Sequence, residues 1–308
     1  MRTVYCIGEI VWDILIRDGL PVAAKAGGSM LNAAVSLGRA GHRVALISET
    51  GADRPGSQIL SFLENNGVST EYIRQDPGKK TAIALAFLDP SGDAEYSFYR
   101  DPPGKNRNRD LPVQGKEDIV LFGSYYSVSE DTGGDVAAFV SDARLRKAMI
   151  LYDPNFRKSH LPQLGKCIPR ILDNFSRSDL VRGSDGDFVT IFAAGNGREA
   201  YDRVREAGCK RLVYTRNKAG AELMTGKIAR TFPVPEIRVK STIGAGDAFN
   251  AGIIHEMMRS GICRDDLDRV DGKGWDRIIG TGIRFAGDVC SGFDNYISPE
   301  LAKEVKSC

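Results

Sequence analysis

The residues with the clearest capacity for chemistry lie late in the chain, in residues 241–252. Gly244 and Gly246 stand two positions apart, which allows a tight backbone turn that approaches a ligand closely. A helical pattern follows at once, and the first N–H groups of a helix lack partners and lie at the positive end of its dipole. We therefore expect the backbone of Gly244, Ala245 and Gly246 to hold a phosphate or a similar oxyanion. A carboxylate at Asp247 would stand at the entrance of that site, where it suits proton abstraction.

The same segment has plainer interpretations. Asp247 could be only the N-cap of the following helix, which is worth about 1 kcal/mol, and the two glycines could be only a turn. A dinucleotide-binding fingerprint requires a third glycine where this chain has Phe249. A Walker A loop requires a Lys-Ser or Lys-Thr pair, and none follows. The segment alone therefore leaves the choice between chemistry and capping open.

A second glycine-led helix start lies near the N-terminus, where Gly27 and Gly28 precede a helical pattern with Asn32 in its first turn. Together the two segments resemble the two signatures of the PfkB (ribokinase-like) carbohydrate kinase family. One signature is a Gly-Gly pair followed by Asn and a helix, and the other is Asp-Thr-x-Gly-Ala-Gly-Asp followed by a helix. The order and spacing also fit, and the resemblance covers nearly the whole chain. Supporting matches are Gly8 with Asp13, residues 51–56, Gly67 with Val68, and residues 153–157.

The resemblance implies a fold, a reaction and a set of site residues. The fold is α/β, a three-layer α/β/α core with a mostly parallel sheet and a small β-sheet lid. The reaction is phosphoryl transfer from ATP, with Mg²⁺, to a hydroxymethyl group of a sugar. Asp247 would be the catalytic base, and the N–H groups of Gly244, Ala245 and Gly246 would form the anion hole. Substrate-binding positions are Asp13, Gly28, Asn32, Tyr99, Arg100 and Arg157, and nucleotide-binding positions are Thr215, Asn217, Gly220 and Thr242.

Three positions depart from the family pattern. Ser241 replaces an Asp that belongs to the monovalent-cation site of relatives, which puts K⁺ activation in question. Asn217 replaces the first glycine of the nucleotide turn, although asparagine accepts a positive φ better than most residues. Asp187 stands where relatives carry the Glu of an Asn-x-x-Glu motif that helps to organise Mg²⁺, and it keeps the charge on a shorter side chain. These departures suggest altered nucleotide or metal handling.

Several substrates and one other class of function stay open. The run Phe98-Tyr99-Arg100 is similar to that of fructokinases, which favours a free ketohexose such as fructose. An acidic sugar, 2-keto-3-deoxygluconate, is second because Arg100 and Arg157 could pair with a carboxylate, and ribose and nucleosides follow. A catalytically silent sugar- or nucleotide-binding protein on the same fold is the rival class. Taken singly, Asp13 and Asn32 could be ordinary turn and helix-start residues, Tyr99 and Arg100 surface residues, and Asp153 and Arg157 a structural ion pair.

Strands and helices must alternate to position these residues. Apolar runs predict strands at residues 4–10, 44–47, 119–122, 148–152, 180–182 and 211–215. Helical periodicity predicts helices at residues 29–40, 56–65, 198–207, 248–259 and 275–290. Such alternation favours a mostly parallel sheet with helices on both faces.

One region breaks the alternation. Residues 81–88 and 95–100 are strand-like and flank a turn at residues 89–93, which is typical of a hairpin. With the apolar run at residues 12–16 they predict a small second sheet. We expect it to be a lid built from about residues 12–26 and 81–108, within a single domain of residues 1–308.

Composition excludes several classes of protein. With 42 Lys and Arg against 40 Asp and Glu, the net charge of +2 gives no electrostatic case for nucleic acid, and the basic residues 105–109 predict only a solvated loop. The six cysteines show no C-x-x-C spacing, and three histidines make a His-rich metal site a poor candidate. No stretch approaches the roughly 20 apolar residues of a membrane span, so we expect a cytoplasmic protein with reduced thiols. Exposed strand edges on the lid could support a homodimer.

Overall fold

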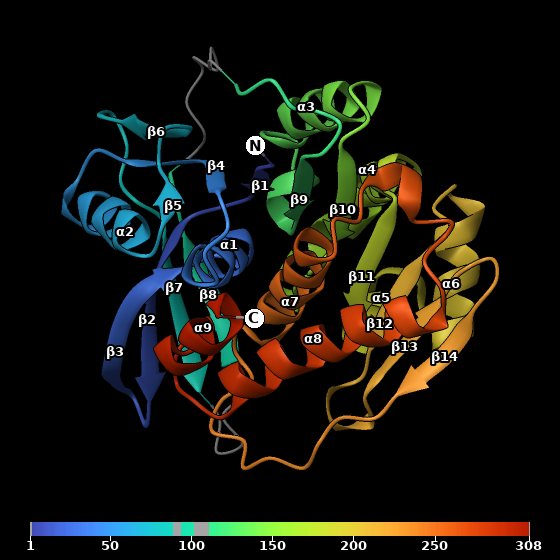
Figure 1. Cartoon of the computed structure of the whole chain (residues 1–308). Coiled ribbons are helices and arrows are strands. Elements are labelled where there is room, and N and C mark those ends of the chain that lie inside the picture. Colours follow the sequence, from blue (N-terminus) through green and yellow to red (C-terminus); the bar gives the residue numbers. More distant parts are fainter. Residues whose placement is uncertain (1, 89–93, 102–110, 308) are drawn as a thin grey trace.

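A ten-stranded sheet runs through the middle of the computed structural model, which describes residues 2–88, 94–101 and 111–307 (Figure 1). Its strands are β1 (Val4–Ile7), β4 (Val44–Gly51), β5 (Val68–Ser69), β6 (Ile73–Asp76), β9 (Ile119–Gly123), β10 (Met149–Asp153), β11 (Leu180–Ser184), β12 (Leu212–Thr215), β13 (Ala221–Met224) and β14 (Ala229–Phe232). They are ordered β14-β13-β12-β11-β10-β9-β1-β4-β5, and β6 also pairs with β4. All pairings are parallel except those of β12 with β13 and β13 with β14. The six predicted strands are confirmed.

Helices cover both faces of this sheet. One face carries α1 (Ser29–Arg39), α2 (Arg54–Asn65), α7 (Ala245–Arg259), α8 (Gly272–Cys290) and α9 (Pro299–Lys306), and the other carries α3 (Gly133–Leu145), α4 (Leu164–Arg177), α5 (Asp185–Phe192) and α6 (Gly197–Glu206). Strand β1 shows why both faces are needed, because its side chains alternate between them. Val4 and Cys6 pack into the core on the first face, and Tyr5 and Ile7 pack into the core on the second. The predicted three-layer α/β/α arrangement is confirmed.

A separate four-stranded sheet lies beside this core (Figure 1). Its strands are β2 (Val11–Arg17), β3 (Leu20–Gly27), β7 (Ile83–Leu88) and β8 (Ala94–Tyr99), in the order β3-β2-β7-β8. The predicted small sheet is confirmed, and β3 completes it although its largely exposed residues carry no apolar alternation. The predicted hairpin turn at residues 89–93, the end of the expected lid at residues 102–108 and the basic run at residues 105–109 lie outside the described residues.

Two further features bear on the sequence predictions. The antiparallel hairpin of β13 and β14 was not predicted, since its strands are only four residues long. Within the described residues, the cysteines are free thiols: Cys6, Cys167, Cys209, Cys263 and Cys290. No helix in this part of the chain combines the length and the apolar character needed to cross a lipid bilayer.

A partly buried histidine pair joins the end of α1 to α7 and makes stability sensitive to pH. His42 Nε2 lies 2.8 Å from His255 Nδ1. Burial lowers the pKa of His42 to about 4, with His255 and Arg2 acting in the same direction. The folded chain therefore keeps His42 neutral down to about pH 4, whereas the unfolded chain takes up a proton near pH 6.5. We expect this pair to remove on the order of 2 kcal/mol from the free energy of unfolding as the pH falls through that window.

Urea unfolding of the wild type and of His42→Asn between pH 4 and pH 7 checks this expectation. The variant should lose less stability than the wild type over that interval, because it has no imidazole at position 42 to titrate. Parallel pH profiles for the two proteins would show that the pair does not control acid stability.

Candidate active site

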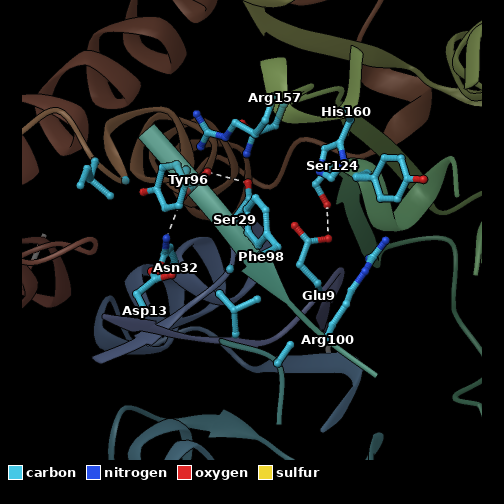
Figure 2. Close-up of a pocket in the computed structure, with 18 residues that line it drawn as sticks. Glu9, Asp13, Ser29, Asn32, Tyr96, Phe98, Arg100, Ser124, Arg157 and His160 are labelled. Atoms are coloured by element: carbon cyan, nitrogen blue, oxygen red, sulfur yellow. Dashed lines mark hydrogen bonds between the residues drawn. The ribbon is translucent and has the colours of Figure 1, made fainter. Parts of the chain in front are cut away.

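A pocket lies where the small sheet faces the ends of several strands of the large sheet (Figure 2). In α/β folds, ligands commonly bind beyond the carboxyl ends of the parallel strands. Here the segments after β1, β9 and β10 meet the N-termini of α1 and α7 and the residues of β2 and β8. The lining residues are Glu9, Val11, Asp13, Gly28, Ser29, Asn32, Ala82, Tyr96, Phe98, Arg100, Ser124, Tyr125, Asn155, Arg157, His160, Ile243, Gly244 and Asp247.

Asp247 is held in this pocket by two side chains from the other end of the chain. Its carboxylate accepts a hydrogen bond from Ser29 Oγ at 2.6 Å and another from Asn32 Nδ2 at 2.9 Å. The residue is only 6% exposed. Gly244 occupies the N-cap position of α7, and Asp247 lies inside the first turn. The alternative that Asp247 is an N-cap is therefore wrong, and its carboxylate is oriented toward the pocket by α1.

The glycines before Asp247 are required by close packing. Gly244 has φ +82°, and a Cβ there would lie 2.3 Å from the backbone oxygen of Asn295. A Cβ on Gly246 would lie 2.5 Å from Nη1 of Arg182. Because no side chain caps either α1 or α7 in the described residues, both helices present their first N–H groups near the pocket. Two positive helix ends at one place suit the binding of an anion.

The Gly-Gly pair allows α1 to approach β2 closely. A Cβ on Gly27 would lie 1.9 Å from Oδ2 of Asp13, and a Cβ on Gly28, which has φ +123°, would lie 2.2 Å from the backbone oxygen of Glu9. Burial raises the pKa of Asp13 to about 7; Lys25 and Arg157 act against this rise, and Asp247 adds to it. Asp13, Gly28 and Asn32 thus meet in the pocket, as the sequence predicted. The Nδ2 of Asn32 donates to Asp247, while its buried Oδ1 has no partner among the described residues and can accept a hydrogen bond from a ligand.

Residues of the small sheet close the other side of the pocket. Arg100 lines it, but Tyr99 does not, and the side chain of Tyr99 is 60% exposed. Since side chains alternate along a strand, Tyr96 and Phe98 of β8 face the pocket in its place. The substrate role predicted for Tyr99 is therefore not supported by its position. The alternation in residues 95–100 was the signal that could have identified Tyr96.

Arg157 also lines the pocket, and it is not the partner of Asp153. Its guanidinium lies 5.7 Å from the ring centre of Tyr96. Asp153, which is fully buried, pairs instead with Arg182 of β11, whose Nη1 lies 3.0 Å from Oδ2. Burial raises the pKa of Asp153 to about 6, although Arg182 opposes this rise. The alternative of an Asp153–Arg157 structural pair is thus wrong, and sequence reasoning gave Arg182 no role.

The Arg182–Asp153 pair supports the turn before α7, and removing one member should be costly. Arg182 also donates from Nη2 to Thr215 Oγ1 at 2.7 Å. We expect Arg182→Met to lower the free energy of unfolding by about 3–5 kcal/mol, because it leaves the Asp153 carboxylate buried without its cation. Urea unfolding measures this change. As a control, Arg198→Met removes an exposed arginine that pairs with Asp202, so an equal loss in both variants would contradict the prediction.

The predicted nucleotide positions do not line this pocket: Thr215, Asn217, Gly220 and Thr242. Asn217 has φ +43° and Gly220 φ +92°, which confirms that this turn needs residues tolerant of positive φ. A Cβ on Gly220 would lie 2.2 Å from the backbone oxygen of Phe232. The turn therefore keeps its backbone shape despite the asparagine.

Asp187, predicted to help organise Mg²⁺, has a structural role in the first turn of α5. Its carboxylate accepts hydrogen bonds from Ser184 N at 2.8 Å, Ser184 Oγ at 2.6 Å and Phe156 N at 2.8 Å. The bonds with Ser184 belong to a capping box, and the Asp187 carboxylate is already surrounded by three protein donors. Among residues 2–88, 94–101 and 111–307, no group of three or more His, Cys, Asp or Glu side chains is arranged to hold a metal ion.

Sequence reasoning missed seven residues of the pocket that carry polar groups: Glu9, Ser29, Tyr96, Ser124, Tyr125, Asn155 and His160. Signals for some of them were present. Ser29 directly follows the Gly-Gly pair, Glu9 lies near the end of the strand predicted at residues 4–10, and Ser124 lies just beyond the strand predicted at residues 119–122. The general rule that sites form at the carboxyl ends of parallel strands would have pointed to Glu9 and Ser124.

Comparison with known proteins agrees with the fold. A sequence model described as pfkB family carbohydrate kinase matches residues 2–274. The probable fructokinase-6, chloroplastic, of Arabidopsis thaliana is 28% identical over 283 residues, which cover 87% of this chain and 73% of that protein. The fructokinase of Rhizobium leguminosarum bv. trifolii is 28% identical over 257 residues, covering 82% of this chain and 78% of that one.

Solved structures share the fold at lower identity. The aminoimidazole riboside kinase from Salmonella enterica, complexed with aminoimidazole riboside and an ATP analogue, has a TM-score of 0.84 and 19% identity, covering 99% of this chain and 100% of that one. The fructokinase from Vibrio cholerae O395, in a fructose, ADP and calcium ion bound form, has a TM-score of 0.87 and 17% identity, with 99% of both chains covered. Since the family match spans most of the chain, the protein belongs to the pfkB family of carbohydrate kinases and is a sugar kinase.

Proposed function

We propose that the protein transfers the γ-phosphoryl group of ATP to a hydroxymethyl group of a free ketohexose, with fructose as the preferred acceptor. The observation that carries this proposal is the placement of Asp247. Its buried carboxylate lies in the pocket, oriented by Ser29 and Asn32, next to the uncapped N-terminus of α7. The relatives named fructokinase support fructose as the acceptor.

The proposed chemistry uses each part of this arrangement. Asp247 removes the proton from the attacking hydroxyl, a step worth about 10²–10⁴-fold in rate. The sugar oxygen then bonds to the γ-phosphorus, the bond to the bridging oxygen breaks, and ADP leaves with the electron pair. The N–H groups of Gly244, Ala245 and Gly246 face the negative charge that the transferring group carries. Asp13, Gly28, Asn32, Arg100 and Arg157 would bind the sugar.

Nucleotide binding is proposed for the turn after β12 and the segment before α7: Thr215, Asn217, Gly220 and Thr242. Mg²⁺ typically binds through phosphate oxygens and a few carboxylates, keeping several waters. The carboxylate of Asp187 is occupied by three protein donors, so it does not fit a direct metal ligand, and Mg²⁺ would be carried by the nucleotide. Ser241 keeps K⁺ activation in question.

The small sheet is proposed to act as a lid within a single domain of residues 1–308. Several of its large apolar side chains are exposed, among them Leu20, Val22, Phe87 and Tyr99. A homodimer formed through the lid would cover such residues, and the mass in solution tests this. A cytoplasmic location remains a prediction.

The proposed function is tested by a coupled ADP-release assay with ATP and Mg²⁺, with and without K⁺. The acceptors are fructose, other free sugars, 2-keto-3-deoxygluconate, sugar phosphates and nucleosides. Turnover with fructose well above the other acceptors supports the proposal. Turnover only with 2-keto-3-deoxygluconate would show that Arg100 and Arg157 bind a carboxylate, and ligand binding without any turnover would favour the catalytically silent protein. Equal rates with and without K⁺ would agree with the loss of the aspartate at position 241.

A further inference from the structure

The pocket has a second polar group of residues away from Asp247, which we call the distal end: Glu9, Arg100, Ser124, Tyr125 and His160. Figure 2 shows Glu9, Ser124, Arg100 and His160 together on one side of Phe98, and Asp13, Asn32 and Tyr96 on the other. The proposed reaction uses Asp247 and its surroundings and gives no task to Glu9. A carboxylate placed inside a ligand pocket, away from the reacting group, requires its own explanation.

Glu9 is fixed by two hydrogen bonds. Its Oε2 accepts one from Ser124 Oγ at 2.6 Å and one from the backbone N of Tyr126 at 3.3 Å. An ionised carboxylate offers about four acceptor sites, so a ligand hydroxyl can still donate to it. Burial raises the pKa of Glu9, while Ser124, Tyr126 and Arg100 act against this rise. Glu9 is thus a well-positioned acceptor at the distal end.

Ser124 is held in an unusual backbone conformation. Its φ of 56° and ψ of −174° fall at the edge of a region that is nearly restricted to glycine. The backbone N of Ser124 donates to the backbone oxygen of Asp153 at 3.0 Å, and a Cβ on Gly123 would lie 1.9 Å from that same oxygen. The tight packing of β9 against β10 therefore imposes this conformation, which directs the Ser124 hydroxyl to Glu9. Such strain is commonly kept where a functional group must be held in place.

The rest of the distal end is aromatic. Tyr125 and His160 stack with ring centres 3.9 Å apart, and Phe98 lies against the other side of His160 at 5.8 Å. Burial lowers the pKa of His160 to about 4, with Arg100 and Arg157 acting in the same direction, so the ring is neutral at physiological pH. Arg100 lies over the ring of Tyr125, 5.1 Å from its centre. Glu9 is thus the acidic acceptor among rings that suit the C–H surface of a sugar.

We propose that Glu9 recognises the hydroxymethyl group at the non-reacting end of a ketohexose, with Ser124 as its positioning residue. The proposal rests on the proposed function. The furanose form of a ketohexose carries a hydroxymethyl group at each end of the ring, whereas the furanose form of ribose carries one. When one of these hydroxymethyl groups lies at Asp247, the other lies across the sugar ring. There, Glu9 at the distal end can accept a hydrogen bond from its hydroxyl. The Glu9–Ser124 pair would therefore distinguish ketohexoses from pentoses and nucleosides.

The test compares fructose with 1-deoxyfructose and 6-deoxyfructose. The analogue that retains the reacting hydroxyl is still phosphorylated and lacks only the hydroxyl assigned to Glu9. We expect the wild type to prefer fructose over that analogue about 10- to 100-fold in kcat/KM, as for a hydrogen bond to a charged group. Glu9→Ala should lower kcat/KM for fructose by the same factor, mainly through KM, and leave the analogue almost unchanged. Glu9→Gln retains an acceptor oxygen and should keep part of the preference.

Two controls keep the outcomes distinct. Glu95→Ala removes an exposed carboxylate of β8 that does not line the pocket, and it should keep the wild-type preference. Ser124→Ala should reduce the preference for fructose over the deoxy analogue without abolishing turnover. If Glu9→Ala does not fold, Ser124→Ala and Glu9→Gln together provide the test. If the wild type phosphorylates fructose and the Glu9 variants retain its full preference, the role of Glu9 is wrong while the proposed function stands. If the wild type does not phosphorylate fructose, both are wrong.

Discussion

Asp247→Asn is expected to lose at least about 10²-fold in kcat while the protein remains folded. An amide has nearly the shape of the carboxylate but cannot take up the proton of the sugar hydroxyl. The side-chain oxygen of the asparagine can still accept the hydrogen bond from Ser29 or Asn32, so the contact between α1 and α7 is largely kept. The coupled ADP-release assay measures turnover, and calorimetry with ATP measures nucleotide binding, which should change little.

A second aspartate provides the matched control. Asp271 is the N-cap of α8, and its Oδ1 accepts a hydrogen bond from Gly274 N at 2.7 Å. Asp271→Asn should keep wild-type turnover, because asparagine also caps helices well. Full activity of Asp247→Asn would remove Asp247 from the role of base. Loss of folding in Asp247→Asn would instead indicate that the carboxylate is needed for structure.

Gly244→Ala is expected to have the second largest effect. Its φ of +82° disfavours any residue with a Cβ, which costs about 1–2 kcal/mol. The added methyl group would also meet three backbone atoms of Asn295 at 2.3–2.7 Å, so the turn before α7 must move. A displacement of about 1 Å near the reacting groups can cost about 10²-fold in rate. We therefore expect kcat/KM to fall by at least that factor and the melting temperature to fall as well.

The variant Gly261→Ala separates the effect of a positive φ from the effect of close packing against Asn295. Gly261 has φ +66°, and a Cβ there would meet no atom within 4 Å. This variant should lose about 1 kcal/mol of stability for the backbone conformation alone and keep wild-type turnover. If Gly244→Ala behaves in the same way, close packing against Asn295 does not position the turn.

Features that depend on neighbouring residues were predictable from the sequence. The two glycine-led helix starts identified Asp247 and the Gly27–Gly28 pair, and the tolerance of asparagine for positive φ anticipated the conformation of Asn217. Apolar periodicity gave the central sheet and its layers. Each of these conclusions rests on a few consecutive residues, whose types limit the local backbone.

Features that depend on contacts across the fold were not predictable. Ser29 and Asp247 are 218 positions apart, and Glu9 and Ser124 are 115 apart, so no local pattern joins them. The sequence left open an ion pair of Asp153 with its near neighbour Arg157, but the structure pairs Asp153 with Arg182 on the adjacent strand. The run of residues 98–100 predicts a substrate role for Tyr99, but a run of three residues does not show which side of β8 faces the pocket. Tyr96 and Phe98 lie on that side, and Tyr99 does not.

The contact of α1 with Asp247 has a consequence for how the protein is made. Ser29 and Asn32 leave the ribosome early in synthesis, and Asp247 emerges more than 200 residues later. Ala245 begins a helix whose first turn also needs Asn295 beside Gly244. Until Asp247 is made, a nascent chain has Ser29 and Asn32 but no carboxylate for them to orient. Under the proposed function, a chain that has not yet reached Asn295 would lack an aligned base and would not consume ATP at this site.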